Sequence, residues 1–354
     1  MKTGSSGRFE ELDVLRGAAA LCVVLSHYSS HCARYFGRGP FGVHLPTIYG
    51  FHAVQLFYMI SGFVIYFTIE RSATWKDFAF ARASRLYPAY WTALTVMVLL
   101  DTAVFRRPFW VGGYLTNLTM FQEFLGFNNL DNVFWSLTVE VAFYVIMAVL
   151  LTVGLTSRIE LVAAIWLVVA ALWSLLDQYL GVALPAFLPR MLILRYVSFF
   201  VAGIVFYRIG RGGPTPARLA LIAAALAEAS VIDGVWDSDV AAVAWSDVLY
   251  RLVVAAILFS VFAMAVTGRL RFTISPITLW LGTISYCLYL SHRNIGYATL
   301  FRLHDRGIAI STSFLIALAG ALTLAVALTY GVERPAMRSL RRWRRARPGG
   351  APAH

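Results

Sequence analysis

Hydrophobic residues lie along the chain in long, nearly uninterrupted runs that short polar stretches separate. A helix needs ~20 predominantly apolar residues to cross ~30 Å of hydrocarbon. Ten segments qualify, with boundaries defined to within a few residues: 12–32, 47–69, 87–104, 133–153, 159–177, 190–209, 217–235, 247–267, 275–299 and 309–332. None alternates like an outer-membrane β-strand, and helices are the remaining way to pair backbone groups in lipid. The pattern predicts an all-α, polytopic membrane bundle of about ten transmembrane helices.

Composition agrees with this pattern. Of the 354 residues, 59% are apolar and 14% are charged, against ~45–50% and ~25% in soluble globular proteins. A soluble fold cannot hide so much apolar surface. The composition therefore excludes a disordered chain, a collagen-like fibre and an ordinary soluble domain, and it makes the lipid bilayer the expected environment.

Lysine and arginine are unevenly distributed between the predicted loops. With a cytoplasmic N-terminus, the inside loops and tails hold 19 basic residues and the outside loops hold seven. Because cytoplasmic loops carry the basic excess in membrane proteins, we predict that both termini are cytoplasmic and that the acidic stretch 233–247 lies outside. The Arg- and Ala-rich composition is typical of GC-rich bacteria, although it reflects codon usage and not chemistry. The expected location is a bacterial cytoplasmic (inner) membrane.

The predicted organisation is a transmembrane domain over 1–335 followed by a basic cytoplasmic tail over 336–354. The net charge of +12 would by itself suit nucleic acid, but a basic stretch directly after an apolar span usually faces the cytoplasm and contacts anionic lipid. We interpret the tail as a topology anchor and expect no nucleic-acid partner. Two loops are unusually long: 70–86 is basic and predicted inside, and 105–132 is aromatic and predicted outside as an interfacial or re-entrant segment.

Three polar residues share one face of the first predicted span. Arg16 and His27 are eleven positions apart, which leaves ~20° between them around a helix and ~16 Å along it, and Asp13 lies close to the same stripe. Each charge inside a span costs ~2.5–3.5 kcal/mol and so requires a partner or a task. A single histidine in a span is usually a packing residue, but this combination favours a functional site.

A carboxylate also occurs inside the fourth predicted span. Glu140 follows Trp135 and Ser136, and Tyr144 lies one turn later on the same side. Such a carboxylate either pairs with an arginine of another span or serves a site, and both alternatives stay open. We take Trp135, Ser136 and Tyr144 as candidate substrate contacts.

Two arginines in the inside loop suit phosphate recognition. Arg82 and Arg85 are three residues apart, so a helical turn points both the same way, and paired guanidinium groups bind phosphate in forked geometry. The alternative is an ordinary positive-inside anchor. In the ninth span, Ser291 and His292 would form a nucleophile and base only if a third group oriented the histidine. The three cysteines lack metal-ligand spacing, so no metal is expected.

Six segments together resemble the acyltransferase-3 family of integral membrane acyltransferases. They occur in the family's order and are LDVLRGAAALCVVLSHY (12–28), HAVQLFYMISGFVI (52–65), FARASRLYPAYW (80–91), FWSLTVEVAFY (134–144), LGTISYCLYLSH (281–292) and VERP (332–335). The resemblance implies the stand-alone, ten-span form without an extra C-terminal domain. It also implies transfer of an acyl group, commonly acetyl, from cytoplasmic acyl-CoA to a hydroxyl of a carbohydrate or glycosylated small-molecule acceptor.

The resemblance carries over five residues, which are Arg16, His27, Arg82, Arg85 and Glu140, and physical chemistry gives each a plausible role. His27 is expected to take the acceptor's proton as general base, or alternatively to carry the acyl group itself. Glu140 or Asp13 would orient its ring, and Arg16 would hold the pantetheine of the donor or polarise the thioester carbonyl. Arg82 and Arg85 would hold the CoA phosphates.

The competing functional class is a transporter or flippase of a lipid-linked or small-molecule substrate. Its signature is a pair of inverted repeats with interrupted spans, which the sequence does not display. A membrane sensor or scaffold would leave Arg16, His27 and Glu140 without a task.

Overall fold

The computed structural model describes residues 9–103, 106, 108–179, 181–182, 185, 187–231 and 245–346. Across these ranges the chain forms helices, with no β-strand among them. The predicted all-α fold is therefore confirmed. Residues 233–244 of the predicted acidic loop and residues 347–354 of the basic tail lie outside the described ranges.

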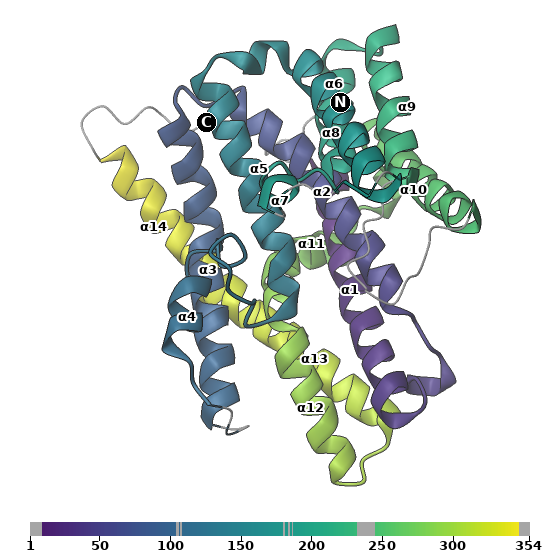
Figure 1. Cartoon of the computed structure of the whole chain (residues 1–354). Helices are drawn as coiled ribbons and strands as arrows, with labels where there is room; N and C mark the ends of the chain where they lie inside the picture. The colour runs from purple at the N-terminus through teal and green to yellow at the C-terminus, as the bar shows by residue number, and fades with distance from the viewer. Residues whose placement is uncertain are drawn as a thin grey trace. The chain divides into compact units, whose positions relative to one another are not determined.

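Fourteen α-helices follow one another along the described chain (Figure 1). They are α1 (Glu10–Phe36), α2 (Thr47–Ile69), α3 (Trp75–Ala103), α4 (Val111–Asn117), α5 (Trp135–Thr152), α6 (Ile159–Ser174), α7 (Phe187–Met191), α8 (Val197–Gly212), α9 (Pro216–Val231), α10 (Trp245–Val266), α11 (Pro276–Ser291), α12 (Arg293–Asp305), α13 (Ile310–Leu328) and α14 (Arg334–Arg345). Each of the ten predicted spans contains helix.

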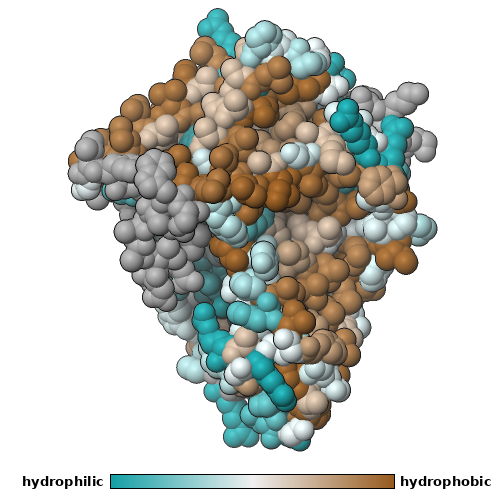
Figure 2. Space-filling view, turned by 90° about the vertical axis from the view of Figure 1, so that its right-hand side faces the viewer, coloured by the Kyte–Doolittle hydropathy of each residue, from teal (hydrophilic) through white to brown (hydrophobic). Residues whose placement is uncertain are grey.

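Five described helical stretches are long and apolar enough to cross a membrane. They are Thr47–Ile69, Asn132–Thr152, Leu155–Asp177, Val248–Val266 and Ile310–Arg344. Large apolar side chains cover much of the face shown in Figure 2, and side chains such as Leu99, Val149 and Ile257 are more than half exposed. Exposed apolar surface of this extent requires lipid in place of water. The chain is a membrane protein, and the number of ten crossings stays a prediction.

The helices form two compact units, which are described separately. The first comprises Met1–Arg16, Val54–Trp75 and Val139–Pro276, and the second comprises Gly17–Ala53, Lys76–Thr138 and Ile277–His354.

Within each unit, helices cross closely at glycine residues. In the first unit, a Cβ on Gly62 would lie 2.2 Å from the carbonyl oxygen of Phe200, and a Cβ on Gly203 would lie 2.0 Å from that of Met59. In the second unit, a Cβ on Gly17 would lie 2.7 Å from the backbone nitrogen of Gly282. Helices in lipid associate by such close backbone packing because no hydrophobic force drives them together.

The prediction of a loop over residues 70–86 is wrong for most of that segment. Helix α3 begins at Trp75 and continues through Pro88. Side chains of this first half pack inward, since Phe78 and Leu86 are buried, and Arg344 of α14 pairs with Asp77. Tertiary packing therefore extends the helix past a proline that the sequence pattern treats as a start.

The ninth predicted span, 275–299, is two helices. Helix α11 ends at Ser291 and α12 begins at Arg293, with a bend at His292. The carboxylate of Asp131 accepts a hydrogen bond from the backbone N–H of Asn294 at 3.2 Å, so it pairs one of the amides that a new helix leaves unsatisfied. The prediction of one continuous helix is wrong because this partner comes from another part of the chain.

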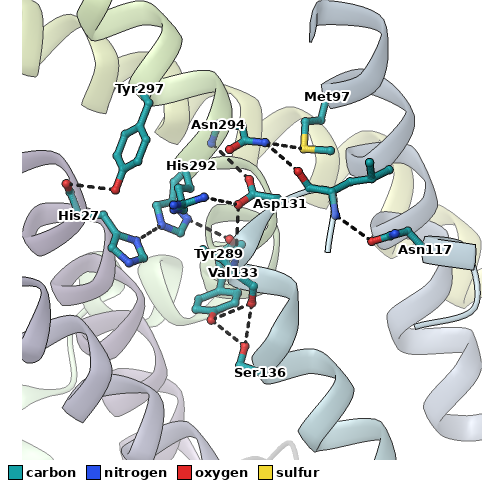
Figure 3. Close-up of polar contacts among 12 residues, drawn as sticks. His27, Met97, Asn117, Asp131, Val133, Ser136, Tyr289, His292, Asn294 and Tyr297 are labelled. Atoms are coloured by element: carbon teal, nitrogen blue, oxygen red, sulfur yellow. Dashed lines mark hydrogen bonds and ion pairs between the residues drawn. The ribbon is translucent and has the colours of Figure 1, made fainter. Parts of the chain in front are cut away.

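The outer loop predicted at 105–132 contains the short helix α4 and a fully buried amide side chain. Asn117 Nδ2 donates to the carbonyl oxygens of Gly113 and Asn128 at 2.8 and 3.1 Å, and its Oδ1 accepts from the N–H of Leu130 at 3.1 Å. These bonds fix the end of the loop that carries Asp131 (Figure 3).

Candidate functional site

Two histidines from opposite ends of the sequence meet in the second unit. The Nδ1 atom of His27, on α1, lies 2.8 Å from the Nε2 atom of His292, at the bend between α11 and α12 (Figure 3). The two rings are nearly parallel, with 9° between their planes and 5.2 Å between their centres. His292 is fully buried, whereas His27 is partly exposed. The pair therefore has an inner member and an accessible member.

The hydrogen-bond partners of His292 determine the tautomers of both neutral rings. Its Nδ1 lies 2.9 Å from the carbonyl oxygen of Tyr289 and 3.2 Å from that of Leu288. Carbonyl oxygens only accept, so Nδ1 of His292 carries the hydrogen and its Nε2 carries the lone pair. The hydrogen between the rings must then belong to Nδ1 of His27. Nε2 of His27 is consequently left with a lone pair that can act as a base or nucleophile.

Helices α1 and α12 approach closely beside this pair. The hydroxyl of Tyr28 donates to the carbonyl oxygen of His292 at 2.7 Å, and the hydroxyl of Tyr297 donates to that of His27 at 3.4 Å. A Cβ on Gly296 would lie only 2.0 Å from the hydroxyl oxygen of Tyr28. Helices α1 and α12 can therefore approach this closely because residue 296 is a glycine.

Arg293, the residue after His292, forms an ion pair with the buried carboxylate of Asp131. Arg293 Nη1 lies 3.4 Å from Asp131 Oδ1, and the guanidinium stands 5.1 Å from the ring centre of Tyr297. Burial raises the pKa of Asp131, and the charge of Arg293 with two backbone N–H groups opposes the rise. Arg293 remains a quarter exposed. The arrangement holds a cation next to the histidine pair in sequence and in the same unit.

Ser136, one of the predicted substrate contacts, joins α5 to α11. Its hydroxyl lies 2.6 Å from that of Tyr289 and donates to the carbonyl oxygen of Val133 at 3.0 Å. It is 5% exposed. Trp135, on the same turn, is partly exposed and stacks on Phe51 at 6.2 Å. The contact of either residue with substrate stays a prediction.

Four other predicted site residues belong to the first unit. Arg16 Nη1 pairs with Asp13 Oδ1 at 2.9 Å on α1. Glu140 Oε1 accepts hydrogen bonds from the hydroxyls of Ser61 and Tyr144 at 2.6 and 2.5 Å. Within the described residues, the carboxylate of Glu140 thus has hydroxyl donors in place of the arginine partner considered as an alternative. The catalytic roles of Arg16, Asp13 and Glu140 stay predictions.

Arg82 and Arg85 lie one turn apart on α3, in the second unit, as the helical spacing requires. Both are partly exposed. Glu333, which is buried and whose Oε2 lies 3.3 Å from Cys287 Sγ, follows α13 in the same unit. Phosphate binding by the two arginines stays a prediction. No group of three His, Cys, Asp or Glu residues with metal-site geometry occurs in the part of the chain that the structure describes.

The sequence pattern did not identify Asp131 or Arg293 as site residues. It predicted His292 as a base only on the condition that a third group orients its ring. Two backbone carbonyls and His27 orient the ring of His292, whereas the hydroxyl of Ser291 donates to the carbonyl oxygen of Cys287 at 2.8 Å. A signal was present: His292, Arg293 and Asn294 form a polar run inside an otherwise apolar segment. Such a run marks either a helix break or a site.

Comparison with known proteins gives one family and three relatives. The family model described as an acyltransferase domain, that of acyltransferase-3, matches residues 9–332. Protein 2 in picA locus of Rhizobium radiobacter is 39% identical over 95 residues, which are 25% of this chain and 44% of that protein. Nodulation protein 10 of Rhizobium leguminosarum bv. viciae is 27% identical over 191 residues, which are 48% of this chain and 51% of that protein.

A third relative aligns over most of both chains. It is the exopolysaccharide production protein ExoZ of Rhizobium meliloti (strain 1021), 26% identical over 316 residues that make up 82% of this chain and 90% of that protein. The chain thus spans about half or less of the first two relatives and most of the third. No solved structure matches the chain.

Proposed function

We propose, from the premise that the chain belongs to the acyltransferase-3 family, that it is a membrane O-acyltransferase. It moves an acyl group, acetyl in the first instance, from acyl-CoA to a hydroxyl group of a carbohydrate. The membrane is the cytoplasmic membrane of a bacterium, with both termini and the donor on the cytoplasmic side. The carbohydrate acceptor is supported by relatives whose names refer to exopolysaccharide production and nodulation.

The observation that carries this proposal is the 2.8 Å contact between Nδ1 of His27 and Nε2 of His292. A base must be held in one tautomer and orientation to accept a proton from a hydroxyl. The carbonyls behind His292 fix its tautomer, and His292 in turn fixes that of His27. His292 thus orients the base as the carboxylate of a catalytic triad does, with an imidazole in place of that carboxylate.

The reaction then follows from the free lone pair of His27. Its Nε2 takes the proton of the acceptor hydroxyl while the hydroxyl oxygen forms a bond to the thioester carbonyl carbon. The tetrahedral intermediate collapses with cleavage of the carbon–sulfur bond, and the imidazolium returns the proton to the leaving thiolate. His292 stabilises the imidazolium by accepting the hydrogen bond from Nδ1–H. Arg293 adds positive charge on the same unit, which favours the oxyanion.

The same lone pair would also serve a relay through an acyl-histidine. In that sequence Nε2 of His27 attacks the thioester first, and the acceptor hydroxyl then attacks the acyl-imidazole. Both pathways need the same tautomer, so the histidine pair supports acyl transfer and leaves the order of steps open.

Arg82 and Arg85 are proposed to bind the phosphates of the donor. CoA carries several phosphate charges, and two guanidinium groups one helical turn apart provide forked, charge-assisted donors. Arg16, which lies on the same helix as His27 and ~16 Å from it along the axis, is proposed to hold the pantetheine of the donor.

Transfer from radiolabelled acetyl-CoA tests the function. The acceptor probe is total polysaccharide from cells that express the chain, treated with mild alkali to remove existing esters. Membranes with the wild-type chain should place label in alkali-labile ester on this polysaccharide, and membranes with His27→Ala should not. If the wild type neither labels polysaccharide nor releases free CoA thiol, the assignment as an acyltransferase is wrong. Transport then becomes the leading hypothesis.

A further inference from the structure

Six aromatic side chains form a cluster between α1 and α12, beyond the histidine pair. The α1–α12 aromatic cluster consists of His31, Tyr35 and Phe36 on α1 and of Tyr297, Phe301 and His304 on α12. The ring of His31 stacks on that of Tyr297, with 3.8 Å between centres and 16° between planes. It also lies 4.5 Å from the ring of Tyr35, whose own ring is 5.1 Å from that of Phe301.

This cluster is continuous with the candidate catalytic base. His27, His31 and Tyr35 are successive members of an i, i+4 series on α1, so they lie on one face with ~6 Å between neighbours along the helix. Tyr297 connects the two groups, because its hydroxyl donates to the carbonyl oxygen of His27 (Figure 3) and its ring stacks on that of His31. A row of rings therefore runs ~12 Å from His27 to Tyr35.

The far end of the row is open. Tyr35 is 56% exposed and Phe301 is 37% exposed. Behind them, His31 is only 6% exposed, and its Nε2 atom is buried without a hydrogen-bond partner in the described ranges. A buried polar atom without a partner costs free energy, so packing alone does not explain a histidine at this position.

The chemistry of the row matches a sugar ring. Aromatic faces are broad, rigid and partly negative, so they attract the polarised C–H groups on one face of a pyranose. A sugar hydroxyl is a suitable hydrogen-bond partner for Nε2 of His31, whose ring lies against those of Tyr35 and Phe301. Arg34 and Arg302, the sequence neighbours of Tyr35 and Phe301, are exposed, and guanidinium groups donate hydrogen bonds to hydroxyl or carboxylate oxygens.

We propose that the α1–α12 aromatic cluster is the acceptor subsite of the enzyme, where a pyranose of the carbohydrate chain stacks on Tyr35 and Phe301. The inference rests on the proposed function and adds a location and a minimum acceptor length. Each pyranose in a chain spans ~5 Å by ordinary bond lengths, so a sugar on Tyr35 is two to three residues from the one acylated at His27. The subsite thus selects oligosaccharide and polysaccharide acceptors over monosaccharides.

An alternative occupant is lipid, because tyrosine and other aromatic side chains also form belts at membrane interfaces. Rings of such a belt face lipid singly. The rings here stack on one another in a row that leads to His27, which favours the sugar.

The test separates the donor reaction from the acceptor reaction in purified protein. The donor readout is release of CoA thiol from acetyl-CoA without acceptor, in which water takes the place of the acceptor hydroxyl and receives the acyl group. This hydrolysis needs His27 and not the cluster. The acceptor readout is the KM for the alkali-treated polysaccharide, compared with the transfer rate to methyl glycosides of its component sugars. The variants are Tyr35→Ala, Phe301→Ala and His31→Phe, with Phe301→Tyr as the conservative variant that keeps a ring. Phe272→Ala, an 80% exposed aromatic of the other unit, is the matched control.

We expect each of the first three variants to raise the KM for polysaccharide by about threefold to tenfold. The rate of thiol release and the transfer to methyl glycosides should be unchanged, and Phe301→Tyr and Phe272→Ala should match the wild type. Unchanged KM values in Tyr35→Ala and Phe301→Ala, with normal thiol release, would overturn the subsite and assign the cluster to lipid. A wild type without thiol release or transfer instead overturns the proposed function, and the subsite with it.

Discussion

Nδ1 of His27 and Nε2 of His292 lie 2.8 Å apart although 265 positions separate them in the chain. The contact orders two rings through a single hydrogen, because carbonyl oxygens behind His292 leave only one arrangement of hydrogens for the neutral pair. The pair accordingly predicts different consequences for substitutions at its two members.

Substitution of His27 should remove the base, and substitution of His292 should only disorder it. We expect His27→Ala to lower kcat ~10²–10⁴-fold and His292→Ala to lower it ~10–10²-fold, as loss of the partner that orients a functional histidine typically does. His292→Gln, whose amide oxygen can accept from Nδ1–H of His27, should recover part of the activity, whereas His292→Phe should not. His44→Ala, an exposed histidine, is the control. Equal activity in the Gln and Phe variants would contradict the hydrogen-bond role.

The buried carboxylate of Asp131 should support both stability and activity. In Asp131→Asn, an amide N–H replaces an acceptor that now faces Arg293 and the backbone N–H groups of Val133 and Asn294. Leaving such a buried group unsatisfied costs ~1–3 kcal/mol, so the melting temperature of the purified protein and its kcat should both fall. Asp305→Asn removes the same charge from an exposed position and should change neither. A variant at 131 with unaltered Tm would show that the ion pair contributes nothing to the fold.

Glycine 296 should tolerate no side chain. Gly296→Ala puts a methyl group 2.0 Å from the hydroxyl oxygen of Tyr28 and should force α12 away from α1, with a cost of ~1–3 kcal/mol. Gly320→Ala is the matched control, because nothing lies within 4 Å of its Cβ on α13. That change should be neutral or stabilising by ~0.5–1 kcal/mol. Thermal unfolding and acyl transfer measured on both variants check this; identical behaviour of the two would refute the close approach.

Substitutions of Arg85 in the proposed donor site should change acyl-CoA affinity independently of the base at His27. Each charge-assisted hydrogen bond contributes ~1.5–3 kcal/mol, so Arg85→Ala should weaken acyl-CoA binding by about one to two orders of magnitude. Arg85→Lys should recover only part of this, since an ammonium group lacks the planar fork. Acyl-pantetheine, which lacks the phosphates in question, should bind wild type and variants alike. Calorimetry on purified protein, with Arg158→Ala as an exposed arginine control, decides the matter. Equal acyl-CoA affinity in all variants would place the phosphates elsewhere.

The topology makes a prediction that is independent of chemistry. Reporter fusions after residue 354 should score as cytoplasmic, and fusions within 233–247 should score as outside, because basic residues favour the cytoplasmic side. A C-terminus outside the cytoplasm would contradict both the ten-span arrangement and the assignment of Arg82 and Arg85 to the donor side.

The sequence alone was enough to establish the class of this protein and its helical segments. Runs of apolar residues long enough to cross lipid are local features, and in lipid a long apolar run has little alternative to a helix. The family followed from short motifs distributed along the chain, and the model match over 9–332 confirms it. The one-turn spacing of Arg82 and Arg85 was equally local, since three residues on a helix always make nearly one turn.

Only the tertiary structure decided which polar residues meet. Sequence reasoning gave His27 a carboxylate partner, Glu140 or Asp13, whereas its ring nitrogen contacts His292. It also placed a helix across His292 and a loop before Pro88, and missed Asp131 and Arg293. The physical reason is the same in each case. Periodicity specifies the faces of one helix, but which face packs against which depends on close approaches such as those at Gly17 and Gly296, and on partners such as Asp131 that come from distant segments.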